Sequence, residues 1–485
     1  MTKGSPSQVV FNLDGTNLDT LENEDFKFLG SLITYRNSSG DVYQYVRDIV
    51  TTGIENIDGS LVRDEYKLKM YADYFLPSIR YHLTVNEITD TYLKSLDALT
   101  NRYLKKWSRL ARPATLAFIH MPECLNIMSV SDLYYQAHSI NYARMKSVSD
   151  SSVIHCLDSA LERESTWTRK KSVLVKSQEV FETVNSADII TLPHLKQQIK
   201  DHFSNERSLE WQNHVQTLAV QGKFFELAAL ESKCVDWKSI IYNLPHKVAR
   251  FLMNALTDTL NTRTNLVRWG KMISDKCKKC NNKETLHHVL NACSIALDEG
   301  RYTWRHDNIL LYLVETIQKG LNDLDESVKI STDLNITPWG KTGISTIPIQ
   351  CTQTTLIPDI CVYWQDTKKL TLIELSVPFE TNVTKAHNYK ESKYAHLVTD
   401  LESKGYKVKL HAIEIGSRGH ITPQNKTRLK SILKEFGKPI TFKLFRDTIS
   451  KLSVISSVTI YYAKDNPKWE IQTPLQIMPT QDTVT

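Results

Sequence analysis

Three cysteines and a histidine with metal-ligand spacing lie in the run CKKCNNKETLHHVLNAC, residues 277–293. Cys277 and Cys280 are separated by two residues, which lets both thiolates of one tight turn face the same ion. His288 and Cys293 can close a tetrahedral Cys3His shell from a following helix, the usual arrangement for structural zinc. His287 is the less favoured ligand, because His288 gives the commoner spacing. The run predicts a structural zinc site; the alternative is a chance cluster of cysteines beside two core histidines.

A second candidate site combines two carboxylates on neighbouring predicted strands. Asp359 follows Pro358 in TTLIPDICVYW, and Glu374 lies in TLIELSV. A short turn at 365–368 would bring both carboxylates to the same end of a sheet, where they are costly unless they share a divalent cation. Mg²⁺ fits, because it takes oxygen ligands and keeps several waters. In a phosphodiesterase those waters supply the nucleophile, and the metal neutralises charge developing on the phosphate.

The helix predicted after Glu374 carries Lys390 and Lys393, which are three residues apart and project from one face. One of them could reach the attacking water or the scissile phosphate. The alternative is that Pro-Asp is a turn, Glu374 is a strand-end charge and the lysines form a solvated helix face. Spacing alone favours this structural interpretation at least as strongly as the catalytic one.

The elements that would position these residues follow a simple order. Beyond Gly300 a helix at 308–319 leads to β-rich runs at 354–364, 369–377 and 406–415, with a helix at 385–403 before the last. This β-β-α-β order predicts an α/β domain with a mixed sheet.

The amino-terminal half is predicted to be mostly helical, because apolar residues recur at three and four from 42 to 148 and again from 209 to 260. Pro77 and Pro113 punctuate the first region, and Pro245 is placed to start a helix in the second. Before them, residues 26–33 (FKFLGSLI) are typical of a short buried strand that turns at Gly30.

The length of 485 residues predicts two to four domains, and 41% hydrophobic with 24% charged residues is typical of a soluble globular protein. No apolar run is long enough for a membrane span, and the amino-terminal sequence has no secretory signal. The five other cysteines stand singly, which favours a reducing compartment and no disulfide framework. The net charge of +6 fits a nucleic-acid partner without establishing one.

Basic residues gather in two places that could meet phosphates. Between 102 and 112 no acid occurs, aromatic residues are interleaved, and helical spacing puts most of the basic side chains on one face. The alternative is an ordinary solvated face. The second group lies in the cysteine turn. The candidate nucleic-acid contacts are Arg102, Lys105, Lys106 and Arg109 in the first group and Lys278 and Lys279 in the second.

The order of these parts resembles the carboxy-terminal half of non-LTR retrotransposon polyproteins that carry a restriction-like endonuclease. In that family a reverse transcriptase is followed by a linker, a CCHC zinc knuckle and a nuclease of the PD-(D/E)xK fold. FKFLGSLI is similar to the closing strand of the polymerase palm, and YADYFLPSIRYHL and LDALTNRYLKKW are similar to thumb helices. GRYTWRHDNIL resembles the family's linker, in which an Arg-His pair follows the knuckle.

The resemblance implies a multidomain chain with a mostly α amino-terminal half, a small CCHC knuckle and an α/β nuclease domain with a mixed sheet. The implied boundaries are 1–25 polar and disordered, 26–148 palm end and thumb-like helices, 149–265 helical linker, 266–300 zinc knuckle, 301–465 nuclease and 466–485 tail.

The resemblance also assigns roles to individual residues. Asp359 and Glu374 match the metal-binding acids. Ser376 stands where many such nucleases have their lysine, so Lys390 is the first choice for the catalytic lysine and Lys393 the second. Arg305 and His306 are expected to contact DNA or to brace the knuckle against the nuclease; the alternative is an ordinary helix start.

The implied function is nicking of a DNA target by a Mg²⁺-dependent endonuclease in the nucleus, with structural Zn²⁺, DNA and RNA as partners, and no membrane association. No Asp-Asp pair in a Tyr-x-Asp-Asp context occurs, so the chain is not expected to act as a reverse transcriptase on its own. The alternative function is a non-catalytic, nucleic-acid-binding remnant of such a polyprotein. A requirement for a divalent metal would distinguish the two.

Overall fold

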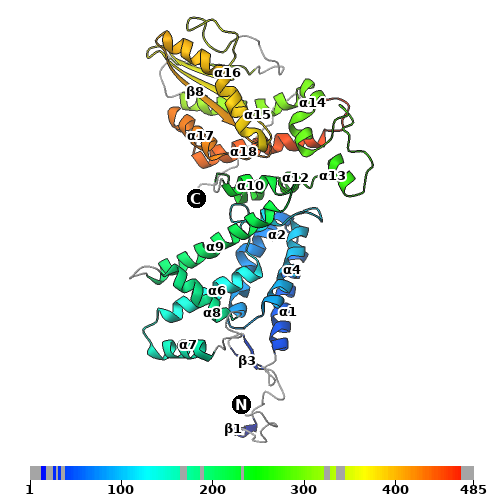
Figure 1. Ribbon diagram of the computed structural model, residues 1–485, viewed down its shortest axis with the longest axis vertical. Helices are drawn as coiled ribbons and strands as arrows, with labels where there is room; N and C mark the ends of the chain where they lie inside the picture. The colour runs from blue at the N-terminus through cyan, green and yellow to red at the C-terminus, as the bar shows by residue number, and fades with distance from the viewer. Residues whose placement is uncertain are drawn as a thin grey trace. The chain divides into compact units, whose positions relative to one another are not determined.

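The computed structural model divides the chain into two compact units (Figure 1). The first comprises 1–109, 119–122 and 126–211, and the second comprises 110–118, 123–125 and 212–485. The structure describes residues 12–17, 26–28, 31–33, 39–163, 172–185, 191–230, 234–321, 328–334 and 345–470. Most of the segment predicted to be disordered, and most of the predicted tail, therefore lie outside the described residues.

The first described elements are two small antiparallel hairpins. They consist of β1 (Asn12–Leu13) with β2 (Thr16–Asn17), and β3 (Phe26–Phe28) with β4 (Ser31–Ile33). The run FKFLGSLI thus forms two paired strands instead of one buried strand. Phe26 is 55% exposed, so the prediction of burial was wrong for this residue.

The rest of the first unit is helical, as predicted. In chain order the helices are α1 (Ser39–Gly59), α2 (Asp64–Met70), the π-helical turn η1 (Tyr71–Phe75), α3 (Leu76–Thr84), α4 (Asp90–Trp107), α5 (Ala117–His120, shared with the second unit), α6 (Val130–Lys146), α7 (Ser151–Arg163), α8 (Val173–Val184) and α9 (Leu192–Gln216, which crosses into the second unit).

Pro77 lies in the first turn of α3, at the boundary with the preceding element, where the sequence predicts punctuation. The π-helical turn η1 lies directly before it, and the N–H of Leu76 donates to Tyr71 O within that wider turn. A π turn changes the hydrogen-bond register, so a residue without an N–H can follow without a broken helix.

The second unit begins with helices and ends with an α/β domain. Its helices are α10 (Lys223–Leu230), α11 (Trp237–Asn243), α12 (His246–Leu256, with Pro245 as its N-cap), α13 (Arg263–Arg268), the π-helical turn η2 (His288–Ala292), α14 (Ser294–Asp298), α15 (Arg301–Leu321), the 3-10 turn η3 (Glu380–Asn382), α16 (Val383–Ser403), α17 (Pro423–Glu435) and α18 (Phe442–Tyr462). None of the helices that the structure describes is long and apolar enough to cross a membrane.

Four strands form one mixed sheet in the order β5-β6-β7-β8. They are β5 (Val328–Thr332), β6 (Ile360–Trp364), β7 (Lys369–Ser376) and β8 (Lys407–Glu414). Neighbours pair antiparallel, antiparallel and parallel in that order, and α16 makes the crossover between the parallel pair. The mixed sheet of the prediction is confirmed; β5 and α18 were not predicted. Residues 354–359 are not strand, since Pro358 has no N–H to give a ladder.

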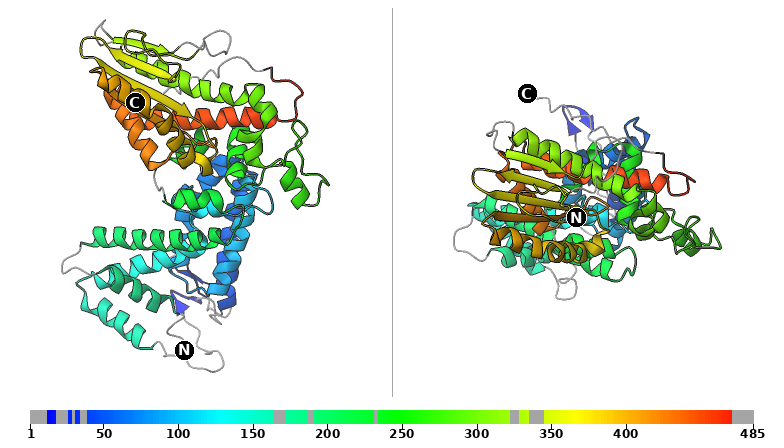
Figure 2. Two further views of the ribbon diagram at one scale, coloured as in Figure 1. Left: turned by 45° about the horizontal axis from the view of Figure 1, so that its top comes forward. Right: turned by 90° about the horizontal axis from the view of Figure 1, so that it is seen from above.

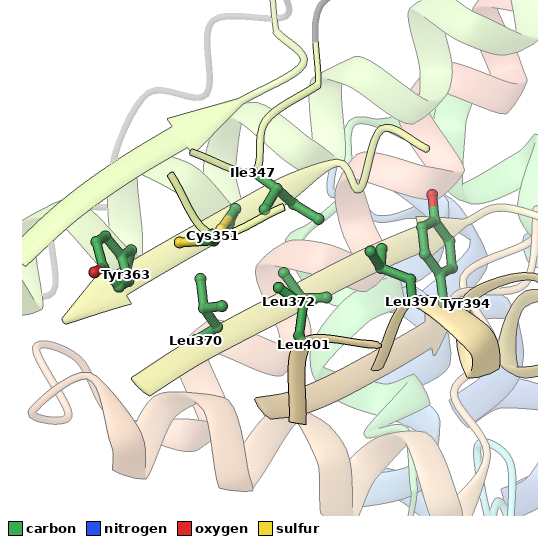
Figure 3. Close-up of a cluster of buried hydrophobic side chains, with 9 residues drawn as sticks. Ile347, Cys351, Tyr363, Leu370, Leu372, Tyr394, Leu397 and Leu401 are labelled. Atoms are coloured by element: carbon green, nitrogen blue, oxygen red, sulfur yellow. The ribbon is translucent and has the colours of Figure 1, made fainter. Parts of the chain in front are cut away.

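The two faces of the sheet are covered by different helices (Figures 1 and 2). One face packs on α16, where Leu397 and Leu401 lie beside Leu370 and Leu372 of β7 (Figure 3). On the other face α17 approaches, since Phe436 at its end stacks on Trp364 with ring centroids 5.8 Å apart. The alternation of the pleat therefore decides which strand residues face α16.

Candidate functional site

The four predicted zinc ligands converge in the second unit. The donor atoms of Cys277, Cys280, His288 and Cys293 all lie within 4.8 Å of one another. The Cys280 and Cys293 sulfurs are 3.8 Å apart, and Cys280 Sγ lies 3.3 Å from His288 Nε2. Tetrahedral zinc with Zn–S bonds of about 2.3 Å requires sulfurs roughly 3.8 Å apart. The donor set therefore fits Zn²⁺.

Local hydrogen bonds hold residues 277–293, called the zinc turn below, in a conformation that brings the ligands together. Cys277 N donates to Asn282 O at 2.7 Å, and Asn281 takes φ 60°, which reverses the chain between the first two ligands and the helix. Tyr302 then bridges the other two ligands, because its hydroxyl donates to His288 O at 3.1 Å and accepts from Cys293 N at 3.0 Å. Burial lowers the pKa of His288, which favours the neutral imidazole that zinc binds.

The two predicted acids lie side by side at one end of the central strands β6 and β7. Asp359 precedes β6 and Glu374 lies near the end of β7, and both face α16 because they share the pleat alternation of Cys361 and Leu372. The side chains of Asp359 and Glu374 are 4% and 3% exposed. Asp359 N donates to Glu374 Oε2 at 3.3 Å, and Leu375 N donates to Asp359 Oδ2 at 2.7 Å.

Lys390 of α16 forms an ion pair with Glu374 Oε1. Lys393, one turn later, donates instead to Tyr394 Oη at 3.1 Å, and that hydroxyl donates to Ile357 O at 3.0 Å. The described contacts therefore separate the two candidate lysines: Lys390 reaches a site carboxylate, and Lys393 reaches a tyrosine beside it.

His306 joins the acid site from α15. Its Nε2 lies 3.2 Å from Asp359 Oδ2 and 3.2 Å from Leu375 O, and its Nδ1 lies 2.8 Å from Asp307 Oδ1. Burial opposes protonation of His306, but the charges and hydrogen bonds of Asp359 and Asp307 together outweigh it and raise the pKa to about 10. The site therefore holds a protonated imidazole against a carboxylate.

The two acids are shifted in opposite directions. Burial works to raise the pKa of Asp359, but the charge and hydrogen bond of His306, with the Leu375 amide, lower it below its usual range. Burial and the charge of Asp359 raise the pKa of Glu374, against the opposing effect of Lys390. Opposite shifts in adjacent carboxyls are typical of functional sites.

Comparison with known families recognises the part of the second unit that holds the cysteines. Residues 222–298 match the family described as zinc-binding in reverse transcriptase. This zinc-binding segment contains all four ligands. No curated protein matches the chain. The family match and the ligand geometry together assign Zn²⁺ to the predicted cluster.

Arg305 braces the zinc-binding segment against the sheet. Arg305 is 1% exposed, and its guanidinium donates to Leu290 O at 2.9 Å and to Val377 O at 3.0 Å. A group buried in this way has no surface to offer DNA, so of the two predicted roles the bracing role fits. His306 likewise contacts Asp359 and not the surface of the zinc turn.

The two lysines of the zinc turn differ. Lys278 is 60% exposed, whereas Lys279 is largely buried and pairs with Glu299 at 2.7 Å. Lys278 lies 3.7 Å from Asp465 but keeps most of its side chain exposed, so of the two it is the better placed for a phosphate contact.

The basic group of the first unit is less continuous than predicted. α4 ends at Trp107 and Arg109 takes φ 51°, so of the predicted contacts Arg102, Lys105 and Lys106 lie on the helix and Arg109 lies beyond it. Arg109 pairs with Asp64, and Lys106 pairs with Asp58 at 2.7 Å. Burial lowers the pKa of Lys105. Arg102 stays exposed on the helix.

The sequence analysis did not identify a further buried acid at the same end of the sheet. Glu414 ends β8 opposite Ser376 of β7 and is 1% exposed. His387 Nδ1 of α16 lies 3.1 Å from Glu414 Oε1, and Arg428 of α17 donates to His387 Nε2 at 2.8 Å. The signal in the sequence was an acid, Glu414, at the carboxyl end of a strand that pairs parallel with its neighbour, because binding sites form at the carboxyl ends of parallel strands.

Proposed function

We propose that the chain is a metal-dependent DNA endonuclease in which Asp359 and Glu374 bind Mg²⁺ and Lys390 orients the reacting groups. The observation that carries the proposal is the convergence of the two buried carboxylates with Lys390 at one sheet edge. Buried acids so close together repel each other, and a shared cation is the usual compensation.

The donor chemistry fits the metal. Both groups offer hard oxygen ligands, and within the described residues the two contacts of the Asp359 carboxylate, from Leu375 N and His306, fall on Oδ2. When bound, Mg²⁺ stabilises charge developing on the phosphate and makes water more acidic. Lys390 holds Glu374 and presents a positive charge where a phosphate would approach. His306 fixes the orientation of Asp359.

The order of the sheet and the family match support the same proposal. One acid lies directly before β6 and the other within β7, which pair antiparallel, and a helix with the lysine leads to a parallel strand, as expected for a restriction-like nuclease. The zinc-binding segment is of the kind associated with reverse transcriptases, which act on nucleic acids. We infer that the chain is retrotransposon-related, binds DNA and RNA, and nicks its target DNA in the nucleus.

The test is nicking of supercoiled plasmid by the full chain with Zn²⁺ retained and Mg²⁺ added or omitted. We expect Mg²⁺-dependent nicking that falls by about 10³-fold in Asp359→Asn and Glu374→Gln, because each removes a charged metal ligand. Lys390→Ala should lose about 10²-fold, whereas Lys385→Ala, an exposed lysine on the same helix, should retain wild-type activity. Unchanged nicking in Asp359→Asn would contradict the assignment.

One observation favours a second function, that of a non-catalytic nucleic-acid-binding protein. His306 and Lys390 already balance the two carboxylates, as in a buried ion-pair cluster that only holds structure. Salt-sensitive DNA binding with no nicking at any Mg²⁺ concentration would select this alternative.

A further inference from the structure

The connection between β7 and α16, residues 377–382, links Glu374 to Lys390 and lies against the zinc turn. Val377 O accepts two hydrogen bonds, one from Asn291 Nδ2 at 2.8 Å and one from Arg305 Nη2 at 3.0 Å. Asn291 lies in η2, between the ligands His288 and Cys293. The zinc turn therefore contacts the chain three residues after Glu374.

A second contact comes from His287, the neighbour of a zinc ligand. Its ring lies against Phe379, with centroids 5.0 Å apart, and its Nε2 lies 3.3 Å from Asn382 Nδ2. Phe379 also packs on the guanidinium of Arg418, which forms a buried ion pair with Glu380 at 2.7 Å. The connection is thus held on the zinc side and on the side of the turn after β8.

The first turns of α15 continue this contact to Asp359. Tyr302 bonds the backbone of two zinc ligands, and Arg305 bonds Leu290 O of η2. His306, the next residue, bonds Asp359 Oδ2 and Leu375 O. One helix end therefore joins the zinc turn to both acid-bearing strands.

We propose that Asn291, Arg305 and His306 are positioning residues through which the zinc-bound turn fixes Asp359, Glu374 and Lys390. The proposal rests on the proposed nuclease function for its activity measurement only. Zinc holds η2 between two of its ligands, and η2 in turn fixes the donors to Val377 O. Without zinc, η2 can move, and the β7–α16 connection loses this support.

The first test is hydrogen exchange on the full chain, zinc-loaded and zinc-depleted, without Mg²⁺. We expect exchange in 374–382 to become about tenfold faster without zinc, because fixed hydrogen bonds are lost, and to recover on reloading. The helix at 90–107 in the first unit serves as the internal control and should not change. Faster exchange confined to 277–293, with 374–382 unchanged, would overturn the proposal.

Variants separate positioning from zinc binding. Asn291→Ala should keep its zinc yet exchange faster in 374–382 and nick about tenfold more slowly at unchanged DNA affinity. Asn261→Ala, an exposed asparagine in the same zinc-binding segment, is the matched control and should behave as wild type. Wild-type exchange in Asn291→Ala would refute its positioning role.

His306 is tested by rescue. His306→Ala should lower the turnover rate about tenfold with unchanged DNA affinity, and His306→Gln, whose amide can still donate to Asp359, should recover most of it. Equal nicking by wild type and His306→Ala would overturn the role of His306. If wild type does not nick at all, the proposed function fails, while the exchange measurement still decides the coupling.

Discussion

The zinc turn and the acid site share one unit but are built in different ways. The four zinc ligands come from a single run, 277–293, and the turn that holds them is closed by hydrogen bonds within it. The acid site draws its groups from α15, the residue before β6, β7 and α16, and each acid is oriented by a residue distant in sequence. The first site depends on local chain geometry, and the second depends on the register of the whole sheet.

This difference has an energetic counterpart. The apolar cluster around the zinc ligands consists mainly of the ligand cysteines themselves with Ala296 and Tyr302, so the metal should supply much of the stability there. The acid site lies beside the apolar core between the sheet and α16 (Figure 3). This core keeps the strands in place whether or not the acids at their ends are charged. Loss of a zinc ligand should therefore disturb structure, and loss of a site acid should disturb chemistry.

The largest effect that sharpens this comparison is expected from Cys280→Ser. A serine cannot replace the thiolate, so we expect apparent zinc affinity to fall by about 100-fold or more and 277–298 to become sensitive to proteolysis. Glu374→Gln should leave zinc affinity unchanged.

Metal content and limited proteolysis of the full chain measure both effects. Cys156→Ser, at an exposed cysteine of α7, is the matched control and should bind zinc as wild type does. Retention of zinc and of protease resistance by Cys280→Ser would show that the turn does not depend on the metal.

A smaller effect is expected on the free energy of unfolding when either acid is replaced by its amide. Asp359→Asn should lower it, whereas Glu374→Gln should not. The lowered pKa of Asp359 means that its charged form stabilises the fold at neutral pH, so Asp359→Asn should cost about 2 kcal/mol. The pKa of Glu374 is raised, so its contribution is fully present below its usual pKa and is lost as the pH rises through the folded value. Glu374→Gln should therefore leave the free energy of unfolding unchanged or raise it by about 1 kcal/mol.

Denaturant unfolding at pH 7, with Zn²⁺ present and Mg²⁺ absent, compares the two variants. A loss of stability of the same size in both would mean that Glu374 is an ordinary buried ion-pair partner and that the pair is not strained.

The same contrast explains how much the sequence could predict. The zinc ligands, the β-β-α-β order and the pairing of Asp359 with Glu374 follow from spacing and periodicity, which are local. β5 was missed because it is an edge strand whose only apolar residues are Val328 and Ile330. α18 was missed because it is rich in serine and β-branched residues, which are poor helix formers.

Tertiary contacts explain why α18 forms a helix despite this composition. Ser450, Ser453 and Ser457 are fully buried, and their hydroxyls donate to the carbonyls of Gly419, Gly416 and Ser417 in the turn after β8. The role of His306 was hidden in the same way, because its partner Asp359 lies 53 residues away. No local pattern carries such information.

The smallest effect is expected from Glu435, a partly buried acid at the opposite end of the same strands. It accepts from Lys369 at 2.7 Å, Lys409 at 3.0 Å and Thr371 at 2.6 Å. Burial opposes its ionisation, but hydrogen bonds from His411, Lys369 and Thr371 outweigh it and lower the pKa. Glu435 is thus the opposite of Glu374, because its partners stabilise the charged form of the carboxylate.

A lowered pKa contributes stability above the usual value of 4.5, and that stability is lost as the pH falls through the folded value. We therefore expect Glu435→Gln to cost about 1 kcal/mol at pH 7, because the two lysines are partly exposed and solvent screens them. The difference from wild type should shrink as the pH falls below 4.5, in unfolding curves measured at several pH values. Glu374→Gln should show no such acid-dependent loss. If both variants lose stability with the same pH dependence, the acid site is electrostatically no different from a structural ion pair, and the charge argument for the proposed nuclease is lost.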